Sequence, residues 1–389
     1  MRKLAELWQN PAEAIFYIML ILTAIGTVNI FSASFVMAQQ TYNNSYFFLH
    51  KHLIAIVIGM ALMILAARID YRCWQKLIWL MVAATIVLLI AVHFYGLTAN
   101  GARRWLNIGI VFQPSEFAKL TAIFAAATYL GPRLHARHRI TLNSWPVLVS
   151  VIMGWLVLMQ PDMGTAAVIV GLCLLLYLVV GIPHKQLLLL VCLGGIGMVY
   201  LVFAAAYRAE RIAAWLDPWA YQQTAGYQTV QSLLAIGSGG LLGTGLGKGA
   251  AKFHYLPEAH TDFAFSVLCQ EMGFVGAALV LLLLGALAWQ GTKVALAAAD
   301  GFGKLLAIGL TVLVVGQAIG NIAMVSGLLP VTGVPLPFIS YGGTSLIVNM
   351  LATGLLINIG RRGAKQSMAK EPPPRPVRKT RIRLVTKNG

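Results

Sequence analysis

Long, nearly uncharged apolar runs recur along this chain and restrict it to one class of structure. From Phe263 to Trp289 the sequence is almost entirely apolar, with Gln270 and Glu271 as the main exceptions. Charged residues make up 11% of the 389, whereas soluble domains carry about 25%. Such a chain cannot cover a water-facing surface, so we expect an all-α integral membrane protein. Because the runs are continuous rather than alternating, they do not fit a closed barrel.

The lengths of these runs set the number of membrane crossings. One crossing needs about 20 predominantly apolar residues. About ten segments meet or approach that length: 14–37, 51–67, 77–95, 115–130, 145–160, 164–182, 186–206, 263–289, 305–329 and 336–359. Ten crossings put both termini on one side of the membrane. Lys and Arg are more numerous on that side, which predicts that both termini are cytoplasmic.

Three regions follow from this topology. Residues 1–13 form a cytoplasmic N-terminus, residues 14–360 a multi-pass membrane domain, and residues 361–389 a basic, disordered cytoplasmic tail. Much of the net charge of +17 lies in the tail. We expect the tail to contact anionic membrane lipids, with docking to a cytoplasmic partner as the alternative. Nucleic-acid binding is not expected, because no folded basic domain accompanies the tail.

Two segments on the outer side are too long to be simple turns. Residues 96–116 separate the third and fourth spans, and residues 207–262 form a large extracytoplasmic loop between spans seven and eight. Long ordered loops on a rigid scaffold often carry function. Within the second loop, GYQTVQSLLAIGSGG predicts a short amphipathic helix. Its apolar side would comprise Val230, Leu233, Leu234 and Ile236.

The glycine-rich segment GSGGLLGTGLGKG at 237–249 resembles a phosphate-binding loop. The pattern GxxxxGK[ST] would need glycine in place of Leu242 and Ser or Thr in place of Gly249. A nucleotide site is therefore not indicated. Two interpretations stay open: a flexible loop whose backbone N–H groups approach a phosphate, or a set of tight turns at the membrane surface.

Several charged residues stand near the outer ends of the spans. Arg103 and Arg104 lie outside, against the general charge bias, and guanidinium groups suit bidentate phosphate binding. Glu116 and Lys119 are three residues apart at a helix start, so a structural ion pair explains both. The alternative is that Lys119 and the arginines bind an anion in an outward-facing cavity. Asp162, in the tight turn between two spans, is expected to serve as a turn or cap residue.

The stretch from Glu258 to Asp262 places three ionisable residues at the mouth of an apolar helix. Asp262 stands directly before that helix, so a helix cap is one interpretation. A single Asp also suffices as the general base or metal ligand of a glycosyl or phosphoryl transfer, and a cap does not explain the nearby Glu258 and His260. Glu271 lies inside the span, where a buried carboxylate must pair or protonate. We expect a structural or supporting role for it.

Several of these segments resemble the SEDS family (shape, elongation, division and sporulation). The matching stretches are GARRW at 101–105, QPSEFAK at 113–119, QPDMGT at 160–165, GYQTVQSLLAIGSGG at 226–240, LPEAHTDF at 256–263, VTGVPLPFISYGGTSL at 331–346 and NIGRR at 358–362. They are spread over most of the chain and fall at the loops and helix ends of the ten-helix topology. On these motifs the chain is identified as a member of the family.

The resemblance implies a peptidoglycan glycosyltransferase of the bacterial cytoplasmic membrane, which joins the glycan of one lipid II molecule to the 4-hydroxyl of another at the outer face. By resemblance, Asp262 of the HTDF motif is the expected catalytic residue, as a base or as a ligand of a divalent cation, Mg²⁺ or Mn²⁺. The expected substrate-binding residues are Arg103, Arg104, Lys119 and His260. The expected supporting residues are Glu116, Glu258 and Glu271. No nucleotide or redox cofactor is expected.

The resemblance also implies partners. A class B penicillin-binding protein, a transpeptidase, would dock on the membrane helices together with other proteins of the division complex. Ala259 favours the division-type or sporulation-type branch, because rod-elongation members typically have Arg there. Two features depart from the family pattern: the spacer LNIGIVF lacks an expected basic residue, and Gln270–Glu271 stands where two acidic residues are usual.

Two other functions fit the same topology. A lipid II flippase would place charged groups along a path through the whole bilayer, whereas here they concentrate at the outer ends of the spans. A non-catalytic scaffold of the division complex would leave Asp262 dispensable and act through the tail and the helix surfaces. Both alternatives stay open from the sequence.

Overall fold

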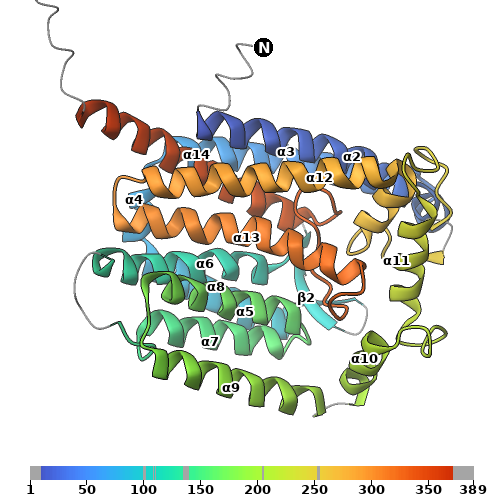
Figure 1. Ribbon diagram of the computed structural model, residues 1–389, viewed down its shortest axis with the longest axis horizontal. Coiled ribbons are helices and arrows are strands. Elements are labelled where there is room, and N and C mark those ends of the chain that lie inside the picture. The colour runs from blue at the N-terminus through green and yellow to red at the C-terminus, as the bar shows by residue number, and fades with distance from the viewer. Residues whose placement is uncertain are drawn as a thin grey trace, which may run out of the picture.

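The fold is a bundle of long helices. The computed structural model describes residues 10–99, 102–107, 109, 111–134, 140–203, 206–251 and 255–370. In this part of the chain the long helices lie side by side along a common direction (Figure 1). They are α2 (Pro11–Tyr42), α3 (Phe47–Arg68), α5 (Ile78–Tyr95), α6 (Pro114–Leu130), α7 (Trp145–Leu158), α8 (Met163–Val180), α9 (His184–Phe203), α12 (Ala264–Ala297), α13 (Gly301–Val325) and α14 (Gly343–Lys370).

These helices correspond one to one to the predicted spans, so the all-α membrane fold is confirmed. Within the described residues, seven helices are long and apolar enough by themselves to cross a membrane, namely α2, α3, α5, α8, α12, α13 and α14. Helices α6, α7 and α9 are shorter or less apolar over their described lengths. Helix α2 begins and α14 ends at the same end of the bundle (Figure 1), as expected for an even number of spans.

Two predicted boundaries were wrong. The last span was expected from residue 336, but α14 begins at Gly343, because Pro335 and Pro337 lack the N–H groups that a helix interior needs. Residues 331–342 instead form a non-helical segment packed into the end of the bundle. At its other end α14 continues past the predicted end of the span at residue 359 to Lys370, so the first residues of the expected tail are helical. The rest of the tail and residues 1–9 lie outside the described residues.

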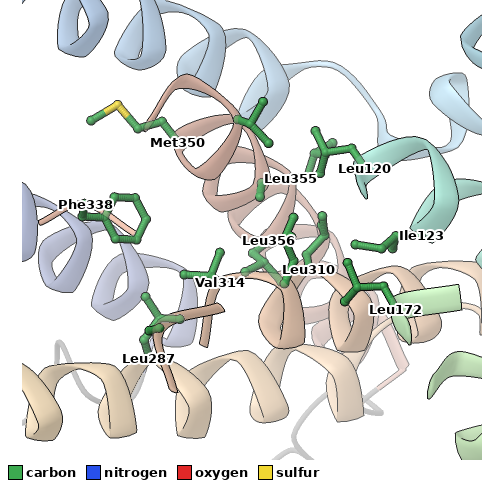
Figure 2. Close-up of a cluster of buried hydrophobic side chains, with 14 of the residues drawn as sticks. Leu120, Ile123, Leu172, Leu287, Leu310, Val314, Phe338, Met350, Leu355 and Leu356 are labelled. Atoms are coloured by element: carbon green, nitrogen blue, oxygen red, sulfur yellow. The ribbon is translucent and has the colours of Figure 1, made fainter. Parts of the chain in front are cut away.

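The core lies where α13 and α14 are enclosed by their neighbours. Figure 2 shows Leu310 and Val314 together with Leu355 and Leu356, surrounded by side chains from the flanking helices. The faces of α3, α5 and α9 that point away from this core carry exposed Leu, Ile, Val and Phe side chains. In a bilayer these faces contact lipid, while the backbone N–H and C=O groups in the interior of a regular helix are paired within that helix.

The first outer loop contains strands that the sequence did not predict. It forms a three-stranded antiparallel sheet in the order β1 (Leu97–Ala99), β2 (Ala102–Asn107) and β3 (Val111–Phe112). In this sheet Arg103 pairs with Thr98. Strands of two to six residues are too short to show a clear alternation of polar and apolar residues in the sequence. Because side chains alternate along a strand, the neighbours Arg103 and Arg104 point to opposite faces of β2.

The second outer loop contains two short helices, α10 (Ala206–Leu216) and α11 (Tyr227–Ser238). Both lie with β2 at one end of the bundle, whereas α4 (Tyr71–Lys76) lies at the other (Figure 1).

The predicted amphipathic helix is confirmed in α11, but the residues predicted for its buried side were only partly correct. Leu234 is 50% exposed, whereas Ser232 is buried. The Ser232 hydroxyl bonds to Ser266 Oγ at 2.7 Å and donates to the Val325 carbonyl at 2.6 Å. Polar contacts therefore help to hold α11 on α12 and α13.

Candidate active site

Asp262 lies in the turn that leads into α12. The turn is closed by backbone bonds from the N–H groups of Thr261 and Phe263 to the Glu258 carbonyl, at 3.1 and 3.2 Å. The cap position of α12 is Phe263, and no side chain caps the helix. The helix-cap interpretation of Asp262 was therefore wrong. The Asp262 side chain is partly exposed, and within the described residues no hydrogen bond or ion pair to its carboxylate is observed.

The surroundings of Asp262 favour its protonated form more than water does. Burial, together with the nearby negative charges of Glu258 and Asp162, raises the pKa of the carboxyl group to about 7, against the opposing effect of Arg104. A carboxyl group with a pKa near neutrality is partly ionised at physiological pH and can take up a proton from a substrate. Asp262 therefore has the properties of a general base.

Arg104 is bound to the turn between α7 and α8. Its Nε donates to the Gln160 carbonyl at 3.3 Å and its Nη2 to the Pro161 carbonyl at 2.5 Å. Its Nη1 lies 3.9 Å from Asp162 Oδ2. Asp162 caps α8 by accepting hydrogen bonds from Thr165, both from its backbone N–H at 3.1 Å and from its hydroxyl at 3.0 Å. The predicted cap role of Asp162 is confirmed, and the turn holds a positive charge near Asp262.

Arg103 has a different environment from its neighbour Arg104. It is exposed, and its Nε donates to Thr98 Oγ1 at 3.2 Å across the sheet. It also lines a shallow surface pocket formed with His93, Thr98, Met159, Gln160 and Pro161. The two arginines therefore do not form a joint clamp in this structure, although both lie close to the turn at residues 160–161.

Glu116 and Lys119 form the ion pair that their spacing predicted. Lys119 Nζ lies 2.8 Å from Glu116 Oε1 and donates to Gln317 Oε1 on α13 at 2.9 Å. Lys119 is 1% exposed and Glu116 3%, so the ammonium group is enclosed between helices rather than open to an outward-facing cavity. The ion pair is confirmed, and it connects α6 to α13.

His260 packs inside the protein beside the Asp262 turn. Its ring lies 4.5 Å from the Phe48 ring and 5.6 Å from the Tyr341 ring, measured between centroids. Its backbone carbonyl accepts a hydrogen bond from the Tyr341 N–H at 2.8 Å. Burial lowers the pKa of the imidazole, although Glu258 opposes this shift. His260 is therefore neutral at pH 7 and anchors the turn to α3 and to residues 331–342.

Glu271 is bound by the glycine-rich segment. Its carboxylate accepts hydrogen bonds from the backbone N–H groups of Gly247 and Gly249, at 3.1 and 3.3 Å, and from Ser32 Oγ at 2.6 and 2.8 Å. Helix α12 is kinked at Gly273, which has a φ of 64°. The phosphate-loop interpretation of residues 237–249 does not hold for these N–H groups, because they bind a carboxylate of the same chain. The pairing expected for Glu271 is confirmed.

Residues 331–336 bring the separate parts of the site together. A Cβ placed on Gly333, which has a φ of 74°, would lie 3.4 Å from Asp262 Oδ2. A Cβ on Gly164 in α8 would lie 2.8 Å from the Thr332 carbonyl. The segment therefore contacts both the Asp262 turn and the start of α8. The motif of this segment is recognisable in the sequence, but these contacts are not.

Two polar side chains of α13, Gln317 and Asn321, were not predicted to belong to the site. Both are buried, at 4% and 0% exposure. They hydrogen-bond to the 331–336 segment, Gln317 to the Pro335 carbonyl and Asn321 to the Val334 carbonyl. The available signal was two carboxamides one helical turn apart in an apolar span, because such groups must find partners when buried.

The residues around Asp262 do not form a metal site by themselves. No group of three or more His, Cys, Asp or Glu side chains that could hold a metal ion exists among the residues that the structure describes. Asp162 and Glu258 accept hydrogen bonds from the hydroxyls of Thr165 and Thr261. The expected divalent cation therefore stays a prediction.

Comparison with known proteins identifies the family. Residues 12–365 match the sequence model of the FtsW/RodA/SpoVE family, described as cell cycle protein. The chain belongs to this family. The SEDS membership expected from the motifs is thereby confirmed, and together with the apolar helices it identifies a multi-pass protein of the bacterial inner membrane.

Relatives within the SEDS family cover nearly the whole chain. The protein is 39% identical over 357 residues to stage V sporulation protein E of Bacillus subtilis (strain 168), which corresponds to 90% of this chain and 97% of the relative. It is 40% identical over 346 residues to the probable peptidoglycan glycosyltransferase FtsW of Geobacter sp. (strain M18), covering 88% of this chain and 94% of the relative.

Solved structures agree with the SEDS assignment. A chain of a peptidoglycan synthase complex, studied for the coordination of polymerization and crosslinking, superposes with a TM-score of 0.74 at 29% identity, covering 89% of this chain and 96% of that chain. The rod shape determining protein RodA of Thermus thermophilus gives a TM-score of 0.67 at 30% identity, covering 89% and 95%.

Proposed function

We propose that this protein is a peptidoglycan glycosyltransferase that polymerises lipid II at the outer face of the cytoplasmic membrane. The observation that carries the proposal is the state of Asp262: a partly exposed carboxylate with no partner among the described residues, a pKa near 7, and Arg104 nearby. The names of the FtsW relatives and the similarity to a peptidoglycan synthase chain support the same activity.

The reaction follows from the chemistry of these groups. The 4-hydroxyl of one lipid II molecule transfers its proton to Asp262 as its oxygen attacks the anomeric carbon of the lipid-linked glycan. A new glycosidic bond forms, the bond to the diphosphate breaks, and undecaprenyl diphosphate leaves with the electron pair. A guanidinium near the leaving group stabilises the developing charge, a role that we assign to Arg104. The polyprenyl chains remain in the bilayer, beside the end of the helix bundle.

The other predicted site residues receive roles that fit their positions. We assign Arg103, which is exposed, to contacts with the glycan or diphosphate of the substrate. Lys119 and His260 are both buried. We assign them an indirect role in substrate binding, in which they stabilise the conformation of the site. The supporting residues are Glu116, which pairs with Lys119, Glu258, which raises the pKa of Asp262, and Glu271, which fixes the glycine-rich segment.

We further propose a role in cell division, in septal wall synthesis, with both termini in the cytoplasm. The FtsW names of several relatives support this assignment, while the relative from sporulation leaves a sporulation role as the alternative. A class B penicillin-binding protein is the proposed partner, because a similar chain belongs to a complex that polymerises and crosslinks. Its membrane helix would dock on exposed apolar faces of the bundle, together with other division proteins.

Glycan synthesis by the purified protein tests the proposed activity. With its cognate transpeptidase and labelled lipid II, we expect ladders of glycan products and release of one undecaprenyl diphosphate per bond formed. Transpeptidase alone is the control and should give no ladders. If a competent complex made no ladders but moved lipid II across a vesicle bilayer, the flippase interpretation would replace ours.

The pH dependence of the reaction should report the ionisation of Asp262. A general base must be deprotonated, so kcat/KM should rise with pH and level off above a midpoint of about 7. Glu258→Gln removes a negative neighbour, which lowers the pKa and should move the midpoint to lower pH. Arg104→Gln removes a positive neighbour and should move it to higher pH. Initial rates between about pH 5.5 and 8.5 measure these midpoints. A midpoint that moves the same way in both variants would contradict this assignment.

A further inference from the structure

A pair of buried carboxamides on α13 ties the Asp262 turn to residues 331–336. Asn321 Nδ2 donates to the Asp262 carbonyl at 2.8 Å and to the Val334 carbonyl at 2.7 Å. One turn earlier, Gln317 Nε2 donates to the Pro335 carbonyl at 3.0 Å. Asn321 is fully buried, and a buried donor of this kind is costly to leave unpaired. The two carboxamides therefore set a fixed spacing between α13, the segment and the turn.

The position of the Asp262 carboxylate depends on this connection. No hydrogen bond holds the carboxylate itself within the described residues, so its place follows from its backbone and its packing. The Asp262 backbone carbonyl is bound by Asn321. The segment borders the carboxylate at Gly333, where a Cβ would lie 3.4 Å from Oδ2, an ordinary contact distance.

The same segment fixes the position of Arg104 relative to Asp262. Gly164, just after the turn bound by Arg104, packs closely on the Thr332 carbonyl. The Asn321 bonds connect Val334, two residues further along the segment, to the Asp262 carbonyl. Asn321 thus belongs to the series of contacts that runs from the Asp262 turn through residues 332–334 to the turn bound by Arg104, and it touches neither charged group.

We propose that Asn321 is a positioning residue for Asp262: its carboxamide fixes the Asp262 backbone to residues 331–336 and thereby sets where the carboxylate stands relative to Arg104. This inference rests on the proposed glycosyltransferase function. Asn321 does not touch the reacting atoms, so it acts on the chemical step through the geometry of Asp262. A displacement of about 1 Å of a catalytic group can cost about 100-fold in rate.

The test compares Asn321→Leu with Asn349→Leu in the complex with the transpeptidase. Leucine has the same branching and number of side-chain heavy atoms as asparagine, but it is bulkier and lacks the donors. Asn349 is a matched control, because it is 1% exposed on α14 and its Nδ2 donates within its own helix, to the Ser345 carbonyl at 2.8 Å. For Asn321→Leu we expect kcat to fall by about 30- to 100-fold with KM within about threefold, and the pH midpoint to move. Asn349→Leu should leave kcat, KM and the pH midpoint unchanged when rates are calculated per folded molecule.

Each rate is divided by the amount of monodisperse, partner-bound protein recovered from size-exclusion chromatography. If Asn321→Leu yields no such fraction, Asn321→Ser, which is small and polar but cannot reach both carbonyls, carries the same expectation. Unchanged kcat and an unchanged pH midpoint would overturn the inference, as would a raised KM at constant kcat. An inactive wild-type complex would contradict the proposed function, and this inference with it, whereas an active wild type with an equally active variant contradicts the inference alone.

Discussion

Replacing Asp262 with Asn is expected to abolish glycan polymerisation while leaving the protein folded. The amide keeps the size of the side chain but cannot take up a proton at neutral pH. Loss of a general base reduces rates by about 100- to 10,000-fold. Because Asp262 does not cap α12, the substitution removes no cap hydrogen bond, and the thermal unfolding temperature should remain close to that of the wild type. Product ladders and thermal unfolding of the same preparation measure both effects.

Asp217→Asn is the matched control for this substitution. Asp217 also lies in the second outer loop, is exposed, and accepts a hydrogen bond from the Ala220 N–H at 3.2 Å, which an amide oxygen can also accept. Its variant should polymerise lipid II at the wild-type rate. Ladders of wild-type length and rate from folded Asp262→Asn would show that the base lies elsewhere and would remove the central argument for the proposed mechanism.

Breaking the buried ion pair of α6 is expected to have the largest effect on stability. Lys119→Met leaves the Glu116 carboxylate buried without its cation, and loss of one partner of a buried pair costs about 3–5 kcal/mol. The free energy of unfolding should fall accordingly, with a low yield of folded protein. The double variant Glu116→Gln/Lys119→Met leaves no charge of the pair buried. It should therefore recover most of the lost free energy of unfolding. Thermal unfolding in detergent compares the three proteins.

Lys51→Met serves as the surface control for the lysine. Lys51 is exposed at the start of α3, where the substitution should change the unfolding temperature little. The double variant also separates the two interpretations of Lys119. A stable double variant with a normal KM assigns the pair to structure, whereas a stable one with a strongly raised KM assigns Lys119 to substrate binding. Wild-type stability of Lys119→Met alone would contradict a stabilising role for the pair.

The parts of the fold that follow from local sequence were predictable. The lengths of the apolar runs located the long helices. The helical period of the apolar residues in α11 could be recognised because twelve residues span several turns. The ion pair of Glu116 and Lys119 followed from spacing on one helix. Resemblance added the assignment of Asp262, but no local pattern distinguished a cap from a free carboxylate at that position.

The rest depends on contacts between distant residues. Asn321 binds a residue 59 positions away, and Ser32 reaches Glu271 across 239 positions. No periodicity indicates such pairs. The glycine-rich segment illustrates the limit: its composition indicates backbone donors available to an anion, but only the fold shows that the anion is Glu271. Similarly, the prolines of the 331–342 segment argue against a helix without indicating that the segment packs against Asp262.

The hydrogen bonds of Arg104 have a consequence for the release of product. Two of its five N–H donors are engaged by the carbonyls of Gln160 and Pro161 before any substrate arrives. A diphosphate that takes these two donors must exchange with those carbonyls, so the free energy of that contact is the difference between two sets of hydrogen bonds. When such a diphosphate departs, the two carbonyls take its place. The turn would thus compete with the spent carrier lipid for part of the guanidinium, which weakens this contact and favours release.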